Sequence, residues 1–154
     1  MSNVTIRAAG PDDHTFILDL VDRLVSFDVP PWRPKAELVE GDRRPLRTWF
    51  DSPKADEAIF IAELEGKPAG YTYLVTLVDF FTERPHAHLS VLAVAAGAEG
   101  KGVGSALLDR SVAWAKQRGS DRLTLSALVT NARARALYEH KGFAGEYIRY
   151  VLPL

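Results

Sequence analysis

Cysteine does not occur in the 154 residues, and neither sign of charge dominates them, since 19 lysines and arginines stand against 20 aspartates and glutamates. Without cysteine, a disulfide framework, a thiolate metal site and a cysteine nucleophile are excluded. The net charge of −1 gives no support for a general nucleic-acid-binding protein, which normally carries a basic excess. With 47% hydrophobic and 25% charged residues, the composition excludes a disordered chain and is typical of a soluble globular protein.

Membrane and export signals are also lacking. No apolar run approaches the ~20 residues that a membrane-spanning helix needs. The first residues, MSNVTIRAAGPDD, do not show the basic-then-apolar pattern of a secretion signal. No linker, repeat or low-complexity segment interrupts the chain, and its length fits one ordinary domain. We therefore expect residues 1–154 to form a single cytoplasmic domain.

The first third of the chain predicts a strand followed by two helical stretches. Residues 4–8 alternate between apolar and polar side chains, which is typical of a strand. After a Pro-Asp-Asp sequence suited to a first helical turn, apolar residues recur at helical spacing from Phe16 to Phe27. The proline-rich segment 27–34 predicts a turn. Residues 35–50 predict a second helix, which Pro45 either breaks or restarts.

From residue 58 the pattern changes to strands, with helices between the later ones. The runs IFIAEL and AGYTYLVTLV are joined by Glu65-Gly66-Lys67, a sequence that favours a hairpin. The elements predicted beyond it are a strand Ala87–Val94, a helix Val103–Arg118, a strand Leu123–Val129, a helix Ala132–Lys141 and a strand Tyr147–Leu152. The strands 87–94 and 123–129 flank a crossover helix, so we expect them to be parallel. The fold class is therefore α/β, or α+β, with a mixed central sheet.

A glycine-rich turn lies between the strand 87–94 and the following helix. Its glycines are Gly97, Gly100, Gly102 and Gly104. Such a run either makes a tight turn that needs positive φ or forms an anion cradle, because bare N–H groups at a helix N-terminus attract phosphate. Four glycines exceed the need of one turn, which favours the cradle. A dinucleotide fingerprint would need glycine at Ser105, and a Walker-type loop would need serine or threonine at Gly102, after Lys101.

Two stretches of the sequence resemble the cofactor motifs of the Gcn5-related N-acetyltransferase (GNAT) family. LAVAAGAEGKGVGSALL (residues 92–108) is similar to the family's strand, pyrophosphate loop and helix. NARARALYEHKGF (residues 131–143) is similar to its second cofactor motif. The order of elements from Val4 onward also fits, so the resemblance covers nearly the whole chain. One departure is Glu99, which stands where the family usually has glutamine or arginine.

The resemblance implies a mixed, mostly antiparallel central sheet with a parallel, splayed strand pair and flanking helices. It also implies direct transfer of an acetyl group from acetyl-CoA, a co-substrate, to a primary amine of a small molecule or peptide within a ternary complex, without a metal. The residues that match the family's cofactor contacts are Leu92, Ala93, Val94, Glu99, Gly100, Lys101, Gly102, Val103, Gly104, Ser105, Asn131, Ala134 and Tyr138. Arg133 or Arg135 could contact the 3′-phosphate, and each is equally compatible with a solvated helix face.

Tyr138 and His88 are the candidate catalytic residues. By the same resemblance, Tyr138 matches the tyrosine that protonates the leaving thiolate in many relatives, and a tyrosine packed on the sheet is the alternative. His88 precedes Leu92 by four residues, where relatives often place a glutamate or histidine that acts as the base. Glu83 and His86, expected in a loop, are further candidates for the base. Alternation along the strand predicts one face with the side chains of His88, Ser90, Leu92 and Val94. The opposite face is wholly apolar and is expected in the core; its residues are Ala87, Leu89, Val91 and Ala93.

The acceptor pocket is expected between the 27–34 turn, the hairpin strand that carries Tyr71 and Tyr73, and the last strands. Candidate lining residues, equally plausible in the core, are Phe27, Trp32, Phe80 and Phe81. The sequence does not identify the amine. Relatives often dimerise through late strands, so the resemblance implies a homodimer, with no nucleic-acid or membrane partner. Two other functions stay open: a non-catalytic acetyl-CoA-binding sensor or interaction module on the same fold, and a dinucleotide-binding oxidoreductase, which the missing glycine at Ser105 disfavours.

Overall fold

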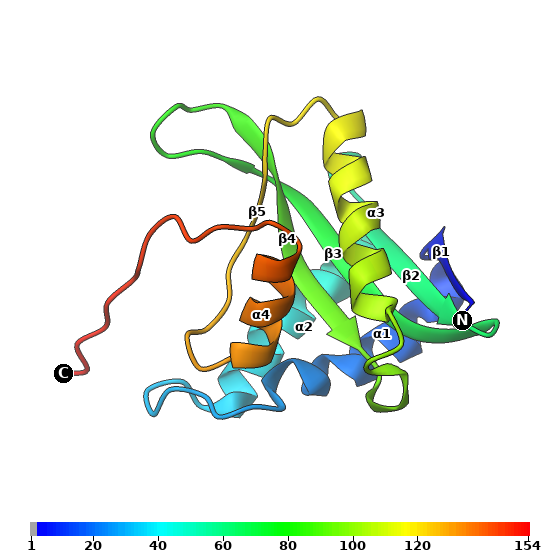
Figure 1. The fold of residues 1–154 in the computed structure, drawn as a ribbon, viewed down its shortest axis with the longest axis horizontal. Helices are drawn as coiled ribbons and strands as arrows, with labels where there is room; N and C mark the ends of the chain where they lie inside the picture. Colours follow the sequence, from blue (N-terminus) through cyan, green and yellow to red (C-terminus); the bar gives the residue numbers. More distant parts are fainter. Residues whose placement is uncertain (1–2) are drawn as a thin grey trace.

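One five-stranded sheet organises residues 3–154, the part of the chain that this computed structural model describes. The strands lie side by side in chain order as β1 (Val4–Ala8), β2 (Ala58–Leu64), β3 (Lys67–Val78), β4 (Pro85–Val94) and β5 (Leu123–Leu125) (Figure 1). Neighbouring strands are antiparallel except for β4 and β5, which are parallel. Glu65 and Gly66, with φ values of 54° and 78°, make the predicted hairpin turn between β2 and β3. The predicted mixed, mostly antiparallel sheet is confirmed.

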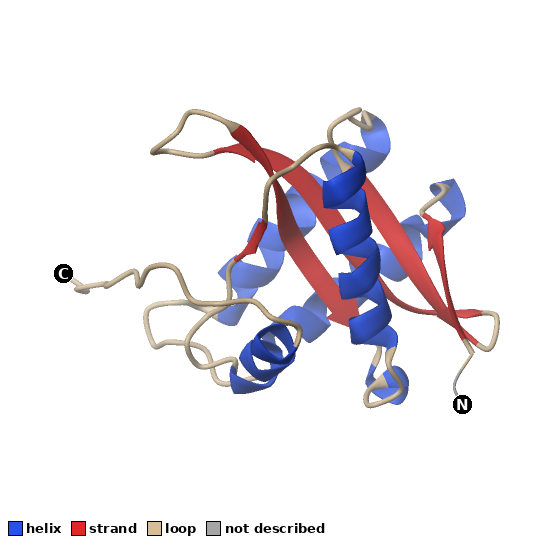
Figure 2. Ribbon diagram, turned by 45° about the horizontal axis from the view of Figure 1, so that its top comes forward, coloured by secondary structure: helices blue, strands red, loops and turns tan. Residues whose placement is uncertain are grey.

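Helices cover both faces of this sheet (Figure 2). They are η1 (Pro11–Asp13), α1 (His14–Leu20), η2 (Val21–Val25), α2 (Lys35–Asp51), η3 (Ala96–Ala98), α3 (Val103–Gln117) and α4 (Ala132–His140). The helices α1 and α2 share a core cluster with one face of the sheet, and α3 and α4 pack on the other face. The apolar residues from Phe16 to Phe27 were predicted to form one helix. In the structure, the helix α1 is shorter and lies between the 3₁₀ turns η1 and η2.

Pro45 lies inside α2 without ending it, so the predicted break is wrong. Proline lacks the N–H group that would donate a hydrogen bond to the carbonyl group of Gly41. Both residues are exposed, so water can donate a hydrogen bond to that carbonyl group instead. Leu46, in contrast, is completely buried in the cluster between α1, α2 and the sheet. The packing of the inner face of α2 therefore outweighs the lost hydrogen bond.

A β-bulge in β4 reverses the direction in which its side chains point. Val91 lies opposite Tyr73 of β3, and Leu89 lies opposite the next residue, Leu74. Ser90 is therefore an extra residue without a partner on β3. An extra residue of this kind shifts the alternation of a strand by one position.

Because of the bulge, the two halves of β4 pack in different hydrophobic clusters. Before it, Ala87 and Leu89 pack in the cluster under α3, whereas Val91 and Ala93 pack after it in the cluster under α1 and α2. All four side chains are 3% exposed, so the prediction that they are buried is confirmed. They do not, however, face one common core.

The same shift separates residues that were predicted to share a face. His88 lies opposite Val75, a residue of the α1–α2 cluster, while Leu92 and Val94 pack toward α3. The prediction of one continuous face from His88 to Val94 is therefore wrong. A bulge depends on how β4 pairs with β3, so the alternation within one strand could not reveal it.

The end of the chain differs most from the prediction. Pairing between β4 and β5 stops at Leu89 and Leu125, so β5 is shorter than the predicted strand 123–129. The predicted strand Tyr147–Leu152 does not form, and residues 144–154 run outward from the body on the β5 side of the sheet (Figure 1). No strand within residues 3–154 lies beside this segment to pair with its backbone, which is the physical reason for its absence from the sheet.

Candidate active site

The glycine-rich turn after β4 forms a cradle at the N-terminus of α3. Gly100 and Gly102 have φ values of 72° and 82°, a left-handed region that favours glycine. Gly102 caps α3, and no side chain in the described chain accepts a hydrogen bond at this cap. The N–H groups of residues 103–105 lie in the first helical turn, where they have no partner within the helix and carry partial positive charge. This geometry fits a phosphate group, as the sequence pattern predicts.

Gly104 brings three elements together beside the cradle. A Cβ at this position would lie 3.3 Å from Leu137 of α4 and 3.7 Å from Val94 of β4. The bare backbone therefore lets α4 and β4 approach the first turn of α3. Further along, Lys141 at the end of α4 forms an ion pair of 2.8 Å with Asp109 of α3. These contacts attach α4 to the wall of the cradle.

Beyond their short pairing, β4 and β5 separate. Residues 90–94 of β4 continue past Leu89, paired with β3 on one side. Within residues 3–154, no strand pairs with their other side. We call this gap the β4–β5 split; it is bordered by residues 90–94 and 126–129. Its β4 edge offers unpaired backbone groups that lead from the last paired rung toward the glycine cradle.

Glu99 joins two arginines at the mouth of the cradle. One carboxylate oxygen, Oε2, lies 2.6 Å from Nη1 of Arg133 in α4, and the other pairs with Nη2 of Arg23 in η2. The hydrogen bond from Arg133 and the charges of both arginines hold the pKa of Glu99 below its usual range. We call these three residues the arginine–glutamate bridge; its net charge is positive. Sequence reasoning missed Arg23, which is 76 residues away from Glu99 and carries no local signal.

The start of α4 distinguishes the two candidate phosphate-binding arginines. Asn131 caps the helix, because its Oδ1 accepts a hydrogen bond of 3.3 Å from the N–H of Ala134. Arg135 donates a hydrogen bond of 3.0 Å to the carbonyl group of Val129, so it helps to hold the preceding turn. Arg133 instead points to the cradle through Glu99.

Tyr138 lies on the side of α4 that meets the sheet. Its ring packs edge-on against Phe143, with centroids 6.0 Å apart, and borders the apolar cluster of β4, β5 and α3. Burial raises the pKa of the Tyr138 hydroxyl group above its ordinary value. The phenol is therefore protonated at neutral pH and can donate a proton or a hydrogen bond. The ring can therefore pack on the sheet while the hydroxyl group of the same side chain serves as a proton donor.

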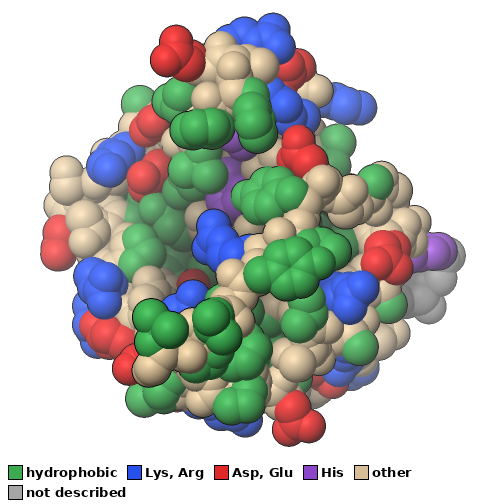
Figure 3. Space-filling model, turned by 90° about the vertical axis from the view of Figure 1, so that its left-hand side faces the viewer, with side chains coloured by type: hydrophobic (Ala, Val, Ile, Leu, Met, Phe, Trp, Pro, Cys, Tyr) green, Lys and Arg blue, Asp and Glu red, His purple; other side chains and the backbone are tan. Residues whose placement is uncertain are grey.

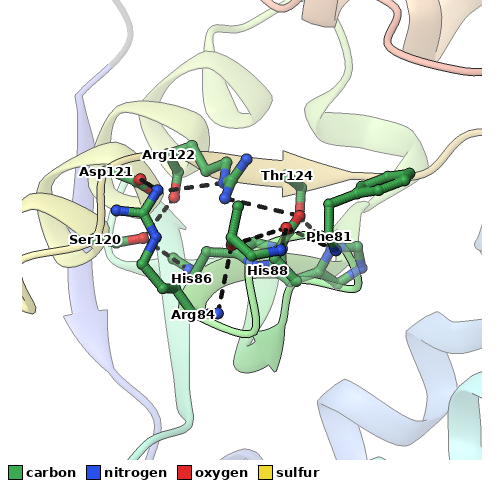
Figure 4. Close-up of polar contacts among 11 residues, drawn as sticks. Phe81, Arg84, His86, His88, Ser120, Asp121, Arg122 and Thr124 are labelled. Atoms are coloured by element: carbon green, nitrogen blue, oxygen red, sulfur yellow. Dashed lines mark hydrogen bonds and ion pairs between the residues drawn. The ribbon is translucent and has the colours of Figure 1, made fainter.

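On the opposite face of the sheet, two histidines share one hydroxyl group (Figure 4). Thr124 Oγ1 of β5 lies 3.0 Å from His86 Nε2 and 2.8 Å from His88 Nδ1. A threonine hydroxyl donates only one hydrogen bond, so at least one of the two ring nitrogens donates to it. Burial, together with the neighbouring His86, lowers the pKa of His88 below its ordinary value. His88 is therefore neutral at pH 7 and able to accept a proton.

Of the other two candidates for the base, only His86 is placed differently from the prediction. His86 lies in β4 and is 8% exposed, not in a loop, and its Nδ1 has no hydrogen-bond partner within residues 3–154. Glu83 does lie in the exposed loop before β4. Thr124 was missed by sequence reasoning. Thr124 could have been found from the register of the parallel strands β4 and β5, which places it directly beside His88.

The expected acceptor-lining aromatics do not belong to the core. Trp32, Phe80 and Phe81 are exposed, and Phe27 is half-buried. Figure 3 shows a hollow on the face beyond β5, with histidine inside it and hydrophobic side chains at its rim. A separate cavity of about 430 Å³ between α2 and β3 includes Tyr73 in its lining and lies away from the glycine cradle.

Among residues 3–154, no group of three or more histidine, aspartate or glutamate side chains is arranged to hold a metal ion. No helix of that part of the chain is long and apolar enough to cross a membrane.

Comparison with known proteins gives consistent matches. A family model described as the acetyltransferase (GNAT) family matches residues 21–143. An uncharacterized N-acetyltransferase of Bacillus subtilis strain 168, YhfO, is 32% identical over 151 residues, or 97% of each chain. A mycothiol acetyltransferase of Beutenbergia cavernae is 38% identical over 111 residues, 69% of this chain but 34% of its own length, so this chain spans about a third of that relative. The solved aminoglycoside N-acetyltransferase AAC(6')-Iy in complex with CoA has a TM-score of 0.74 at 16% identity, over 99% of this chain and 96% of that chain.

Proposed function

This chain belongs to the acetyltransferase (GNAT) family, and we propose that it transfers the acetyl group of acetyl-CoA directly to a primary amine within a ternary complex. Acetyl-CoA would supply the acetyl group as an activated thioester. The observation that carries the proposal is the path from the open edge of β4 to the uncapped first turn of α3. One end of this path offers backbone groups to an extended arm, and the other offers a cradle to phosphate.

Residues of three elements would hold the co-substrate. The N–H groups of residues 100–105 would bind the pyrophosphate, with the exposed Lys101 adding a positive charge. The open edge at residues 92–94 would pair with the pantetheine arm as an added strand does. The amide NH₂ of Asn131 is not used by its capping bond, and the small Ala134 leaves room beside it. Each of these residues lies along the β4–β5 split or at its end.

The arginine–glutamate bridge would take part in phosphate binding. Arg133 and Arg23 present two cations at the cradle, held in place by one carboxylate. A phosphate group offers the same kind of charged, bidentate acceptor as Glu99, so the two would compete for the arginines. Glu99 would thus position the arginines before the phosphate arrives and moderate how tightly it binds. This role gives a physical meaning to the departure from glutamine or arginine.

Proton movements would be divided between the two faces of the sheet. An alkylamine with a pKa near 10.4 is almost fully protonated at neutral pH and must lose a proton before it attacks. His88, neutral and on the α1–α2 face, would accept this proton through a water molecule. Tyr138, on the α3–α4 face, would protonate the departing thiolate. A backbone N–H of β4 would stabilise the negative charge that develops on the carbonyl oxygen.

The bulge at Ser90 gives this division a structural basis. It places His88 and the Tyr138 cluster on opposite faces, and the β4–β5 split connects the two faces. An amine could therefore enter from the α1–α2 side while the co-substrate lies along the other. Acid and base would act on the two sides of the same thioester.

A panel of amines with acetyl-CoA tests the proposed reaction. The panel would include an aminoglycoside, an amino sugar, a polyamine, a lysine-containing peptide and a free amino acid, with thiol release and the mass of the product as readouts. We expect at least one amine to accelerate thiol release and to appear acetylated. If calorimetry shows that coenzyme A binds but no amine accelerates thiol release, the protein is a non-catalytic acetyl-CoA-binding module instead.

A further inference from the structure

Two buried hydroxyl groups meet between β3 and α3. Thr72 of β3 and Ser111 of α3 are both completely buried, and their side-chain oxygen atoms lie 3.4 Å apart. The buried residues on either side of Ser111 in α3, among them Leu107, Leu108 and Trp114, are apolar. Valine and alanine would fill the same space without a polar atom, and burying a hydroxyl group costs free energy unless it forms a hydrogen bond. The two hydroxyl groups therefore call for an explanation beyond packing.

The hydrogen bonds of the pair lead to the backbone of β4. Thr72 Oγ1 donates its single proton to the carbonyl group of Val91, 3.1 Å away, because a carbonyl group can only accept. Ser111 donates to the carbonyl group of Leu107 at 2.7 Å, within its own helix. Ser111 Oγ is thus fixed by α3, and it lies against Thr72 Oγ1 and limits the rotation of that side chain.

The bulge in β4 makes this support important. Its extra residue, Ser90, directly precedes Val91 and interrupts the pairing with β3 at that point. A strand next to such an interruption has fewer backbone contacts that fix the tilt of its peptide groups. Thr72 supplies one additional contact, to the first carbonyl group after the bulge.

The bond from Thr72 also determines which way the next N–H group points. In a planar trans peptide, the carbonyl and N–H groups point in opposite directions. Because the carbonyl group of Val91 points to β3, the N–H group of Leu92 points away from β3 and into the β4–β5 split. A second contact gives the same alternation, since the N–H group of Ala95 donates a hydrogen bond of 2.8 Å to the carbonyl group of Ala69 in β3.

We propose that Thr72, held by Ser111, is a positioning residue that aims the N–H group of Leu92 at the thioester carbonyl of acetyl-CoA. The inference rests on the proposed function. When the amine nitrogen forms its bond to the carbonyl carbon, the π electrons move onto the oxygen, and they return when the C–S bond breaks and the thiolate leaves. An N–H group fixed at that oxygen stabilises the charge better than one that is free to tilt. Neither hydroxyl group touches the reacting atoms.

Infrared spectroscopy of bound acetyl-CoA, labelled with ¹³C at the thioester carbonyl, reports this hydrogen bond without turnover and without an acceptor. A hydrogen bond lowers the stretching frequency of a carbonyl group. We expect the band at a higher frequency in Thr72→Val than in the wild type, and at the wild-type frequency in Thr72→Ser, which keeps the hydroxyl group. Ser111→Ala should shift the band in the same direction as Thr72→Val but by less.

Thr76→Val is the matched control, because Thr76 lies on the same strand and donates a hydrogen bond of 2.9 Å to the carbonyl group of Asp56. It should leave the band unchanged. Calorimetry should give affinities for coenzyme A, which lacks the acetyl group, within about twofold of the wild type in all four variants. With the best amine of the panel, kcat of Thr72→Val should fall about 10-fold at constant KM for acetyl-CoA, which is part of the loss caused by removing a whole donor.

The outcomes separate this inference from the proposed function. If acetyl-CoA binds but the band is the same in Thr72→Val and the wild type, or if Thr76→Val shifts it equally, the positioning role is wrong and the proposed function stands. If Thr72→Val does not fold, Ser111→Ala decides, and an unshifted band there overturns the inference. If the wild type does not bind acetyl-CoA, the proposed function fails and the inference fails with it.

Discussion

The two walls of the β4–β5 split differ sharply in how they are packed. One wall belongs to the closed half of the molecule, formed by β1–β4, α1–α3 and the short 3₁₀ turns between them. Every buried residue of the described chain lies there, between Asp13 and Ala115. The other wall belongs to the open half, formed by β5, α4 and residues 144–154, where the side chains are half-buried or exposed. The residues that we propose to hold the co-substrate are divided between the halves, since the glycine cradle lies in the first and Asn131 and Tyr138 lie in the second.

This difference in packing indicates that the two walls have different functions. A packed wall fixes the positions of the backbone groups of β4 and of the first turn of α3. Under the proposed function, these groups would hold the thioester and the phosphates of acetyl-CoA. A loosely packed wall can move and gain order when a ligand or a second chain covers it. We therefore interpret the open half as the part that binding completes.

Truncating one leucine in each half tests the contrast in stability. Leu107→Ala in α3 removes a completely buried side chain and should lower the free energy of unfolding by about 4 kcal/mol. Leu137→Ala in α4 removes a half-buried one and should cost about 1 kcal/mol. Urea denaturation followed by circular dichroism measures both. Equal losses would mean that α4 is as well packed as α3 and would remove the contrast.

Blocking the cradle should have the next largest effect. Gly102→Asp places a side chain and a negative charge at a residue with φ of 82°, directly before the first turn of α3. Coenzyme A binding should weaken about 200-fold, or by roughly 3 kcal/mol, because the carboxylate repels the phosphates. Gly119→Asp is the matched control, since Gly119 has φ of 71° with open space around it at the far end of α3. Calorimetry on both variants should show a defect only at Gly102.

Removing the hydroxyl group of Tyr138 tests the chemistry of the open half. Tyr138→Phe keeps the ring and its packing on Phe143, so the affinity for coenzyme A should stay within a few-fold. The rate constant kcat should fall about 100-fold, within the range of general acid catalysis. Because the pKa of Tyr138 is raised, wild-type activity should not decline through loss of this proton below pH 10. A matching loss of affinity and rate would instead identify a binding contact.

The smallest effect is expected at His88, which lies across the sheet from the co-substrate path. His88→Gln should lower kcat/KM about 10-fold near pH 7, less than the loss of a base in direct contact, because the proton moves through water. Since the pKa of His88 is lowered, the imidazole stays neutral as the pH falls to about 6.5, and the wild-type advantage should persist to that point and disappear below the folded-state pKa. The advantage should also shrink toward pH 10, where amines deprotonate unaided. His140→Gln, an exposed position on α4, serves as the control; two parallel pH profiles would exclude His88 as a base.

Sequence reasoning succeeded where a residue's environment is set by its near neighbours in the chain. The hairpin at Glu65-Gly66, the cradle glycines and the helix α3 follow from local pattern, and the structure has them where the pattern predicts. The parallel pairing of β4 and β5 followed from the length of the crossover helix between them. The burial of the odd-numbered residues of β4 also followed from their apolar character alone.

Sequence reasoning failed where distant pairing decides. The face of His88 depends on the bulge at Ser90, which arises from the register with β3. The partners of Glu99 include Arg23, brought close only by the packing of η2 near the cradle. The strand expected at 147–152 has the right composition, but a strand forms only where it runs beside another strand. Residues 144–154 run outward from the body instead. The failures therefore concern contacts between elements, not the elements themselves.

The central claim is that the open half becomes ordered when a ligand binds. The most direct test is hydrogen–deuterium exchange with and without coenzyme A. We expect the amides of β2–β4, and those of α3 from Ala106 onward, to be protected in both states. Residues 100–105, β5 and α4 should exchange quickly in the free protein and slow by at least tenfold when coenzyme A saturates it, because ligand contacts close the split. If coenzyme A binds but the exchange of β5 and α4 is unchanged, or if both halves are equally protected without it, the account is wrong.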